Sequence, residues 1–256
     1  MFKLDEIRGL ADVPRVQARS RGAAIAQIFE DRETTFSLFD ERISRVAQGL
    51  IAAGLPAQSR IGFLGKNSDR YFELLFGAAK AETVLVGINW RLALPEIEYI
   101  LNDAGCTTVF VGAEYYEVVE QLAARNPSLS LIVALDGGHP SWPAFDAWRD
   151  AQAAVDPLLP MRADDDVLQL YTSGTTGHPK GVRLTNANYL ALWEASEAAR
   201  WGLFDAEQVT LTCMPVFHVA GCNMGVFALA QGSTNLILKD VDPYKILEFV
   251  PRYHVA

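Results

Sequence analysis

Short apolar runs alternate with longer segments of helical periodicity between Ser37 and Leu135, and this alternation is the strongest constraint on the fold. The runs RIGFL, TVLVGIN, TTVFV and LIVAL are rich in β-branched and aromatic residues, as buried strands are. Between them, apolar residues recur every three to four positions, which predicts helices. Parallel strands need such helical connections. The pattern therefore predicts an α/β fold of mostly parallel sheets covered by helices.

Residues typical of helix ends set limits to the predicted helices. Ser37 and Asp40 have the spacing of a capping box, so we expect the first helix to begin there and to end at Gly54. Pro95 suits the first turn of a later helix, and Gly105 suits its end. A second series follows, with strands predicted in VLQLYT, VRLT, VTLTCMP and TNLIL and helices near residues 188–200 and over residues 243–253.

Length and loop composition predict how the chain is divided. A chain of 256 residues falls between one and two domains. Residues 137–166 contain four prolines and end in the acidic run Asp164 to Asp166. Adjacent carboxylates could bind a metal, but they usually form a solvated loop, which is the interpretation we adopt. We expect a first α/β subdomain at residues 1–136, a connector at 137–166 and part of a second α/β subdomain at 167–256.

Charge and cysteine content exclude several classes of protein. The chain has 22 Lys and Arg against 31 Asp and Glu, a net charge of −9, which argues against nucleic acid or an anionic membrane as a partner. Three cysteines fit neither a disulfide framework nor a zinc site. The N-terminal residues lack the apolar core of a signal peptide, and no apolar stretch is long enough to cross a bilayer. We expect a cytoplasmic protein with reduced thiols and no transmembrane segment.

The most informative segment is YTSGTTGHPKGV, residues 171–182. Its glycines allow backbone N–H groups to converge on anionic oxygens, its hydroxyls add donors, and Lys180 adds a positive charge, which together suit a polyphosphate. It is not the P-loop of kinase-like enzymes, because Pro179 stands five positions after Gly174 and the lysine precedes Gly181. The sequence predicts a loop between two strands, with no helix starting directly after it. A hairpin that binds nothing is the alternative.

This segment resembles the phosphate-binding loop of the adenylate-forming superfamily, which includes acyl-CoA synthetases, peptide-synthetase adenylation domains and luciferases. FGAAKAETVLVGINWRL with PEIEYILNDAG resembles an upstream block of that family, and PVFHVAG resembles its acyl-pocket motif. The resemblance extends from about Ala24 to Ala256. It implies the N-terminal portion of the adenylate-forming enzyme fold.

The resemblance also implies a two-step reaction with ATP, Mg²⁺ and coenzyme A. A carboxylic acid first forms an acyl-adenylate and pyrophosphate, and a thiol then displaces AMP to give a thioester. Lys180 would stabilise charge on the leaving pyrophosphate. The implied nucleotide-phosphate contacts are Thr172, Ser173, Gly174, Thr175, Thr176, Gly177 and Lys180.

His218 is the second residue to which the resemblance gives a catalytic role. The family places a histidine or an aromatic residue here, beside the carboxylate of the acyl substrate. Because a carboxylate is already ionised at pH 7, we expect His218 to orient the acid or gate its pocket and not to act as a necessary base. Ala220 lies where family members that act on aromatic acids often carry a polar or aromatic side chain, so the resemblance favours an aliphatic acid. Cys213 and Cys222 flank the histidine in apolar surroundings and are interpreted as core residues.

Family members continue well beyond the point that corresponds to Ala256, through an adenine site, a magnesium-binding acidic residue and a mobile C-terminal domain. We therefore expect this chain to be the N-terminal half of an acyl-CoA synthetase, truncated within its second subdomain and inactive alone. Alternatives are a non-catalytic phosphate-binding half of a split protein and an adenylating enzyme with an acceptor other than coenzyme A. Self-association is also expected, through apolar residues of the terminal helix: Ile246, Leu247, Phe249 and Val250.

Overall fold

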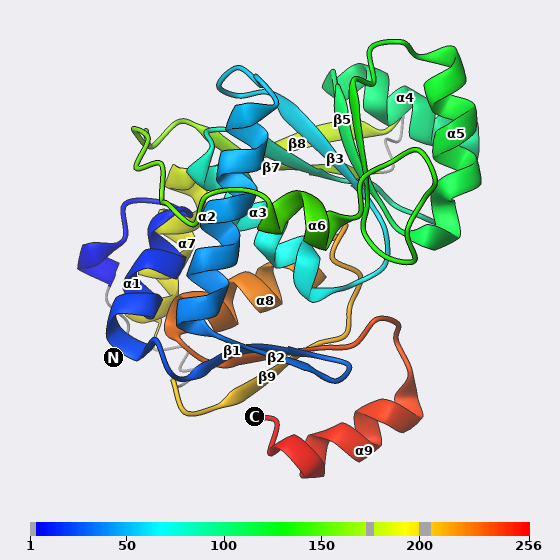
Figure 1. Ribbon diagram of the computed structural model, residues 1–256. Coiled ribbons are helices and arrows are strands. Elements are labelled where there is room, and N and C mark those ends of the chain that lie inside the picture. Colours follow the sequence, from blue (N-terminus) through cyan, green and yellow to red (C-terminus); the bar gives the residue numbers. More distant parts are fainter. Residues whose placement is uncertain (1–3, 173–176, 200–205) are drawn as a thin grey trace.

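Two β-sheets with helices between and outside them organise the protein (Figure 1). The computed structural model describes residues 4–172, 177–199 and 206–256. The larger sheet has the strand order β6-β5-β3-β4-β7-β8 and the smaller sheet the order β2-β1-β10-β9. The larger sheet contains β3 (Arg60–Leu64), β4 (Val84–Gly87), β5 (Thr108–Val111), β6 (Leu131–Ala134), β7 (Asp166–Thr172) and β8 (Lys180–Thr185). The smaller sheet contains β1 (Ile25–Phe29), β2 (Arg32–Thr35), β9 (Val209–Thr212) and β10 (Thr234–Ile237).

Most strand pairs are parallel, which confirms the predicted fold class. Only the pairs β1–β2 and β7–β8 run antiparallel in the described residues. Helical segments supply the connections: α1 (Asp12–Arg21), α2 (Phe36–Ala52), α3 (Asp69–Lys80), α4 (Leu94–Ala104), α5 (Tyr116–Arg125), α6 (Phe145–Asp150), α7 (Asn186–Ala198), α8 (Val219–Gln231) and α9 (Pro243–Tyr253). Short 3-10 turns occur at η1 (Leu4–Glu6) and η2 (Ala113–Tyr115).

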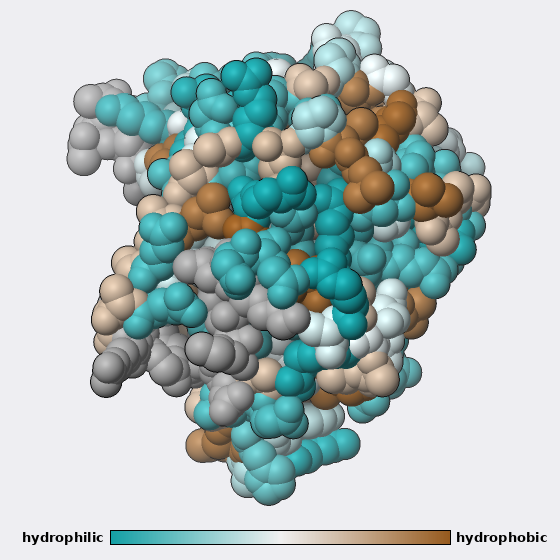
Figure 2. Space-filling view, turned by 90° about the vertical axis from the view of Figure 1, so that its left-hand side faces the viewer, coloured by the Kyte–Doolittle hydropathy of each residue, from teal (hydrophilic) through white to brown (hydrophobic). Residues whose placement is uncertain are grey.

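The helices form layers on either side of the larger sheet (Figure 1). Helix α3 contacts β4 and β7 on one side and β1 on the other, so it lies between the two sheets. The core around it joins residues of both sheets, such as Phe72 and Leu75 of α3 with Leu85 of β4 and Phe29 of β1. A second cluster buries the opposite face of the larger sheet against α4 and α5. On the face turned to the viewer in Figure 2, hydrophilic residues predominate and apolar residues form separate groups.

The helix limits confirm one prediction and correct another. Helix α4 has proline in its first turn, and Gly105 ends it with a φ of 69°. Helix α2, however, begins at Phe36, because Thr35 and not Ser37 is its N-cap and accepts a hydrogen bond from the backbone N–H of Leu38. Thr35 ends β2 in an extended conformation, which leaves its hydroxyl free to cap.

The last residue of the predicted connector, Asp166, does not lie in the solvated loop that we expected. Asp166 is only 7% exposed and begins β7, so it is not part of a solvated loop. Its carboxylate accepts a hydrogen bond of 2.5 Å from Arg60 Nη2, which offsets the cost of burial. Both sheets combine strands from before and after residues 137–166, so the division into sheets does not coincide with the predicted division into subdomains. Among the described residues, no helix is both long and apolar enough to span a bilayer.

A buried lysine ties the connector to the helical layer. The side chain of Lys80 is fully buried, and its Nζ lies 2.6 Å from both Asp40 Oδ1 and Asp156 Oδ2. Asp156 also pairs with Arg15 of α1 at 2.7 Å. Partial burial alone would raise the pKa of Asp156, but hydrogen bonds from Arg15 and Lys80 outweigh burial and hold that pKa well below its usual range.

Replacing Asp156 by Asn should therefore lower the free energy of unfolding by about 2 kcal/mol at pH 7, because charged hydrogen bonds are lost. A carboxylate whose pKa is lowered by folding contributes its full stabilisation above the pKa that it has in the unfolded chain, about 4. This stabilisation is lost progressively as the pH falls from that value toward the pKa of the folded state. Urea denaturation from pH 7 to pH 3 should show the deficit shrinking below about pH 4. Asp164→Asn, whose carboxylate is 80% exposed, is the control and should change little. A deficit at Asp156 that does not vary with pH would contradict this assignment.

Candidate functional site

The carboxyl ends of the parallel strands from both sheets meet in one region. Strand β3 lies between β4 and β5, so the chain reverses its direction across the sheet at β3. In open α/β sheets, ligands bind outside the carboxyl ends of the strands at such a point. Ion pairs bring the neighbouring loops together: Lys66, after β3, lies 3.3 Å from Glu114, after β5, and 3.0 Å from Asp240, after β10.

Asn67 joins the loops of the two sheets. It follows β3 and is 3% exposed. Its Nδ2 donates to the carbonyl oxygens of Met214 and Leu238, at 3.0 Å each, and its Oδ1 accepts from the N–H of Val216 at 2.9 Å. From the sequence alone, Asn67 and Ser68 are candidates to cap the helix that follows them. Ser68 is indeed the N-cap of α3, but Asn67 holds the β9–α8 turn and the end of β10 against the larger sheet.

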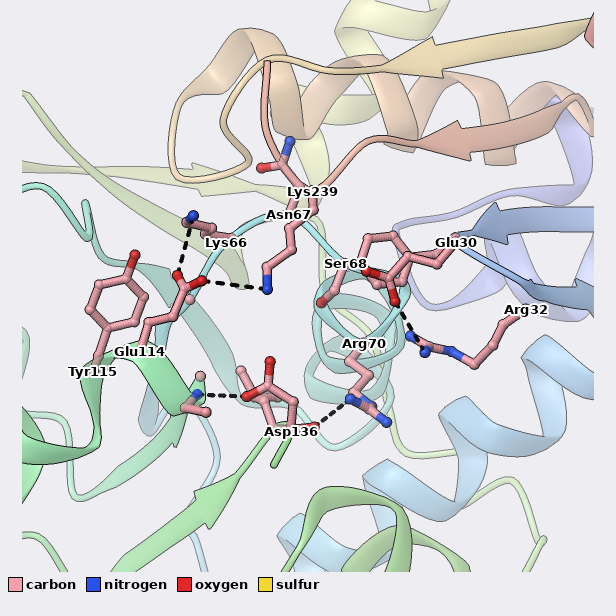
Figure 3. Close-up of a pocket in the computed structure, with 15 residues that line it drawn as sticks. Glu30, Arg32, Lys66, Asn67, Ser68, Arg70, Glu114, Tyr115, Asp136 and Lys239 are labelled. Carbon is pink, nitrogen blue, oxygen red and sulfur yellow. Dashed lines mark hydrogen bonds and ion pairs between the residues drawn. The ribbon is translucent and has the colours of Figure 1, made fainter. Parts of the chain in front are cut away.

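A charged cleft lies beside this junction (Figure 3). Its volume is about 120 Å³. Its four cationic side chains all pair with carboxylates: Arg32 with Asp69, Lys66 with Asp240 and Glu114, Arg70 with Asp146, and Lys239 with Glu114. The cleft thus has no surplus of positive charge from these side chains. Of the predicted site residues that the structure describes, none lines this cleft.

The predicted phosphate loop closes a hairpin between β7 and β8. Thr172 and Lys180 are register partners at the end of this antiparallel pair that adjoins the loop. Strand β8 begins at Lys180, so the prediction that the loop joins two strands is confirmed. Gly177 has a φ of 104°, a conformation that favours glycine. The predicted contacts Ser173, Gly174, Thr175 and Thr176 lie outside the described residues.

Lys180 differs in its surroundings from the cations of the cleft. It is exposed, and no carboxylate within residues 4–172, 177–199 and 206–256 forms an ion pair with it. An ammonium group without an internal partner is available to an anionic ligand. In the same part of the chain, no group of three His, Cys, Asp or Glu side chains is placed to hold a metal ion.

The glycine after Lys180 lies close to two side chains of β7. A Cβ on Gly181 would lie 2.5 Å from Gln169 Nε2 and 3.1 Å from the ring of Tyr171. These two side chains cross β8 there, and Gln169 donates to the Tyr171 hydroxyl at 3.1 Å. That hydroxyl donates to Asp103 Oδ2 at 2.6 Å. Burial and then the Asp103 carboxylate raise the pKa of Tyr171, so it stays a donor at neutral pH.

His218 is the N-cap of α8 and is exposed. Gly221, in the first turn of α8, packs against the turn before His218. A Cβ at Gly221 would lie 2.3 Å from the carbonyl oxygens of Met214 and Pro215, so this position needs glycine. The backbone of Phe217 packs over β4, where its Cα would lie 3.2 Å from a Cβ on Gly87. Gly87 of β4 pairs with Leu170 of β7, so the segment of Phe217 and His218 packs beside the strand that leads into the hairpin loop.

Trp90 and Arg91, which follow β4, also lie at this edge of the larger sheet. The guanidinium of Arg91 stands 4.1 Å from the ring centroid of Trp90 and 5.6 Å from that of Phe217. Cys222 is a buried core residue, as expected, whereas Cys213 is only half-buried. Burial raises the pKa of the Cys222 thiol to about 11 and also raises the pKa of the Cys213 thiol. Neither thiol is therefore activated as a nucleophile.

Comparison with known proteins identifies the family. The family model described as AMP-binding enzyme matches residues 14–256, nearly the whole chain. The chain belongs to the AMP-binding enzyme family. Among curated members, the fatty acid–[acyl-carrier-protein] ligase ScoC of Streptomyces coeruleorubidus is 37% identical over 219 residues, covering 84% of this chain and 41% of ScoC. The feruloyl-CoA synthase of an Amycolatopsis species is 31% identical over 250 residues, covering 97% of this chain and 48% of that enzyme.

A solved structure of an AMP-binding relative has the same architecture. The N-terminal domain of FACL13 from Mycobacterium tuberculosis superposes with a TM-score of 0.84 at 28% identity. The match covers 98% of this chain and 62% of that one. The chain therefore has the fold of the N-terminal part of adenylate-forming enzymes, and it spans less than half the length of the two curated relatives above.

Replacing Asn67 by Ala should destabilise this AMP-binding enzyme fold, because two carbonyls and one amide lose their buried partner. Each unsatisfied buried group costs about 1–3 kcal/mol, so we expect the free energy of unfolding to fall by about 3 kcal/mol in urea. Asn102→Ala is the matched control, because Asn102 is exposed on α4, and it should change stability by less than about 0.5 kcal/mol. Equal stability of the two variants would show that Asn67 does not hold the sheets together.

Proposed function

We propose that this chain supplies the nucleotide-phosphate loop of an ATP-dependent ligase that joins a carboxylic acid to the thiol of coenzyme A. The observation that carries the proposal is the hairpin. In a chain of the AMP-binding enzyme family, a glycine- and hydroxyl-rich segment closes between Thr172 and Lys180, whose ammonium group has no carboxylate partner among the described residues. The names of the relatives, acyl-CoA and fatty-acid ligases, support the reaction class.

In the proposed reaction, a carboxylate oxygen of the acid attacks the α-phosphorus of ATP, and the bond to the leaving pyrophosphate breaks. Lys180 and the Thr172 hydroxyl stabilise the negative charge that grows on the pyrophosphate. Gly177 lets a loop N–H face the phosphates. Mg²⁺ would neutralise part of the triphosphate charge. The coenzyme A thiol then attacks the acyl carbon, and AMP leaves.

His218 is proposed to face the acid. The ring of His218 is exposed at the start of α8, beside the strands that lead to the hairpin. It can therefore donate a hydrogen bond that orients the carboxylate of the acid. The small Ala220 beside it supports an aliphatic acid. The name of ScoC supports a fatty acid too, but also the alternative of a carrier-protein thiol as acceptor in place of coenzyme A. We further propose a cytoplasmic site of action.

Because the chain spans less than half of these relatives, we propose that it binds nucleotide but has little ligase activity alone. Robust acid-dependent ATP–pyrophosphate exchange by the 256-residue chain would contradict that part of the proposal.

The exposed face of α9 supports self-association as a second property. Tyr244, Leu247 and Val250 are 85%, 73% and 42% exposed, whereas Ile246 and Phe249 are half-buried. Exposed apolar side chains on one amphipathic helix favour contact with another apolar surface. Light scattering that gives the mass of a single chain at high concentration would contradict self-association.

Lys180→Ala tests the phosphate loop directly. Removing the ammonium group should weaken binding of Mg-ATP to this chain about tenfold, equivalent to about 1.4 kcal/mol, as measured by titration calorimetry. Lys245→Ala, at another exposed lysine, should bind as the unmodified chain does. Equal affinities for the Lys180→Ala and Lys245→Ala variants would refute the assigned role.

A further inference from the structure

Two side chains of α4 face the hairpin that carries the loop. Tyr99 and Asp103 are four residues apart and so lie on one face of the helix. The ring of Tyr99 stacks on the ring of His178, with centroids 5.0 Å apart and planes at 21°. Asp103 Oδ2 accepts the hydrogen bond of 2.6 Å from the Tyr171 hydroxyl.

These contacts hold the segment at both of its ends. Tyr171 directly precedes Thr172 on β7, and His178 stands two residues before Lys180. Two residues of extended chain span at most about 7 Å, so the position of the His178 ring restricts where the Lys180 backbone can lie. The positive φ of Gly177 turns the chain immediately before the stacked ring.

The two contacts differ in what they can explain. The Tyr171 hydroxyl is further held by Gln169 within β7, so that arm of the hairpin has support from its own strand. His178 is exposed and precedes β8. In the part of the chain that the structure describes, its ring contacts the ring of Tyr99. Histidine offers a flat ring at this position, and an offset stack on tyrosine favours one placement of the backbone.

We propose that His178 is a positioning residue, whose stack on Tyr99 fixes the C-terminal end of the phosphate loop so that Lys180 meets the nucleotide phosphates. The inference rests on the proposed function of the loop. It assigns α4, an element distant in sequence from the loop, the task of pre-organising a nucleotide site. Pre-organisation reduces the ordering cost of binding and therefore increases affinity.

The experiment measures Mg-ATP binding to the whole 256-residue chain by titration calorimetry. His178→Ala and Tyr99→Leu each remove one ring of the stack and should weaken binding about fivefold. The double variant should bind no more weakly than either single one, because both remove the same contact. His178→Phe restores a flat ring and should recover most of the affinity. A role in stability alone would not produce this pattern of rescue and non-additivity.

His139→Ala is the matched control. His139 also stacks on an aromatic ring, Trp142, with centroids 3.6 Å apart, but it belongs to the segment after β6 and contacts Glu120 and Tyr116. This variant should bind ATP as the unmodified chain does.

The outcomes separate the two proposals. Unchanged affinity of His178→Ala, or failure of His178→Phe to rescue it, together with weakened binding by Lys180→Ala, would overturn the positioning role and leave the phosphate loop intact. Equal affinity of Lys180→Ala and the unmodified chain, or no ATP binding by the unmodified chain, would overturn the proposed function itself.

Discussion

The arrangement of this site depends on one buried amide, the side chain of Asn67. Helix α3 lies between the two sheets, so the loops after their strands are joined by side chains. Asn67 joins them with two donated hydrogen bonds and one accepted bond to the loops after β9 and β10. A buried amide that is fully satisfied specifies one arrangement, because any shift leaves polar groups unpaired in a medium of low dielectric. The β9–α8 turn that presents His218 is held in this way.

The cationic side chains of the charged cleft and of the hairpin differ in whether they pair with carboxylates. In the cleft of Figure 3, Lys66 and Lys239 pair with Glu114, and the Lys239–Glu114 pair links the two sheets. Arg70 pairs with Asp146 of α6. On the hairpin, Lys180 has no such partner among the described residues. A cation that is already paired with a carboxylate attracts an incoming phosphate less strongly than an unpaired cation does. The size of the cleft is therefore a poorer guide to nucleotide binding than the surroundings of Lys180.

Local sequence pattern predicts many of the helices and strands but not which of them pair. Strand β7, the turn to β8 and the end of α4 at Gly105 follow from β-propensity, glycine and proline, which act over a few residues. The pairing of β1 with β10 joins segments about two hundred residues apart, and no local pattern encodes it. The burial of Asp166 depends likewise on Arg60 of β3. Asn67 shows the same limit: its sequence context indicates a helix cap, whereas its partners in the second sheet are visible only in the folded chain.

We propose that the β7–β8 hairpin, and not the charged cleft, binds the triphosphate. A crystal structure of this chain with Mg-ATP would decide between these two sites. We expect β- or γ-phosphate oxygens within hydrogen-bond distance of Lys180 Nζ and of the Thr172 hydroxyl. A triphosphate bound instead among Lys66, Arg70 and Lys239, with Lys180 still facing solvent, would contradict it.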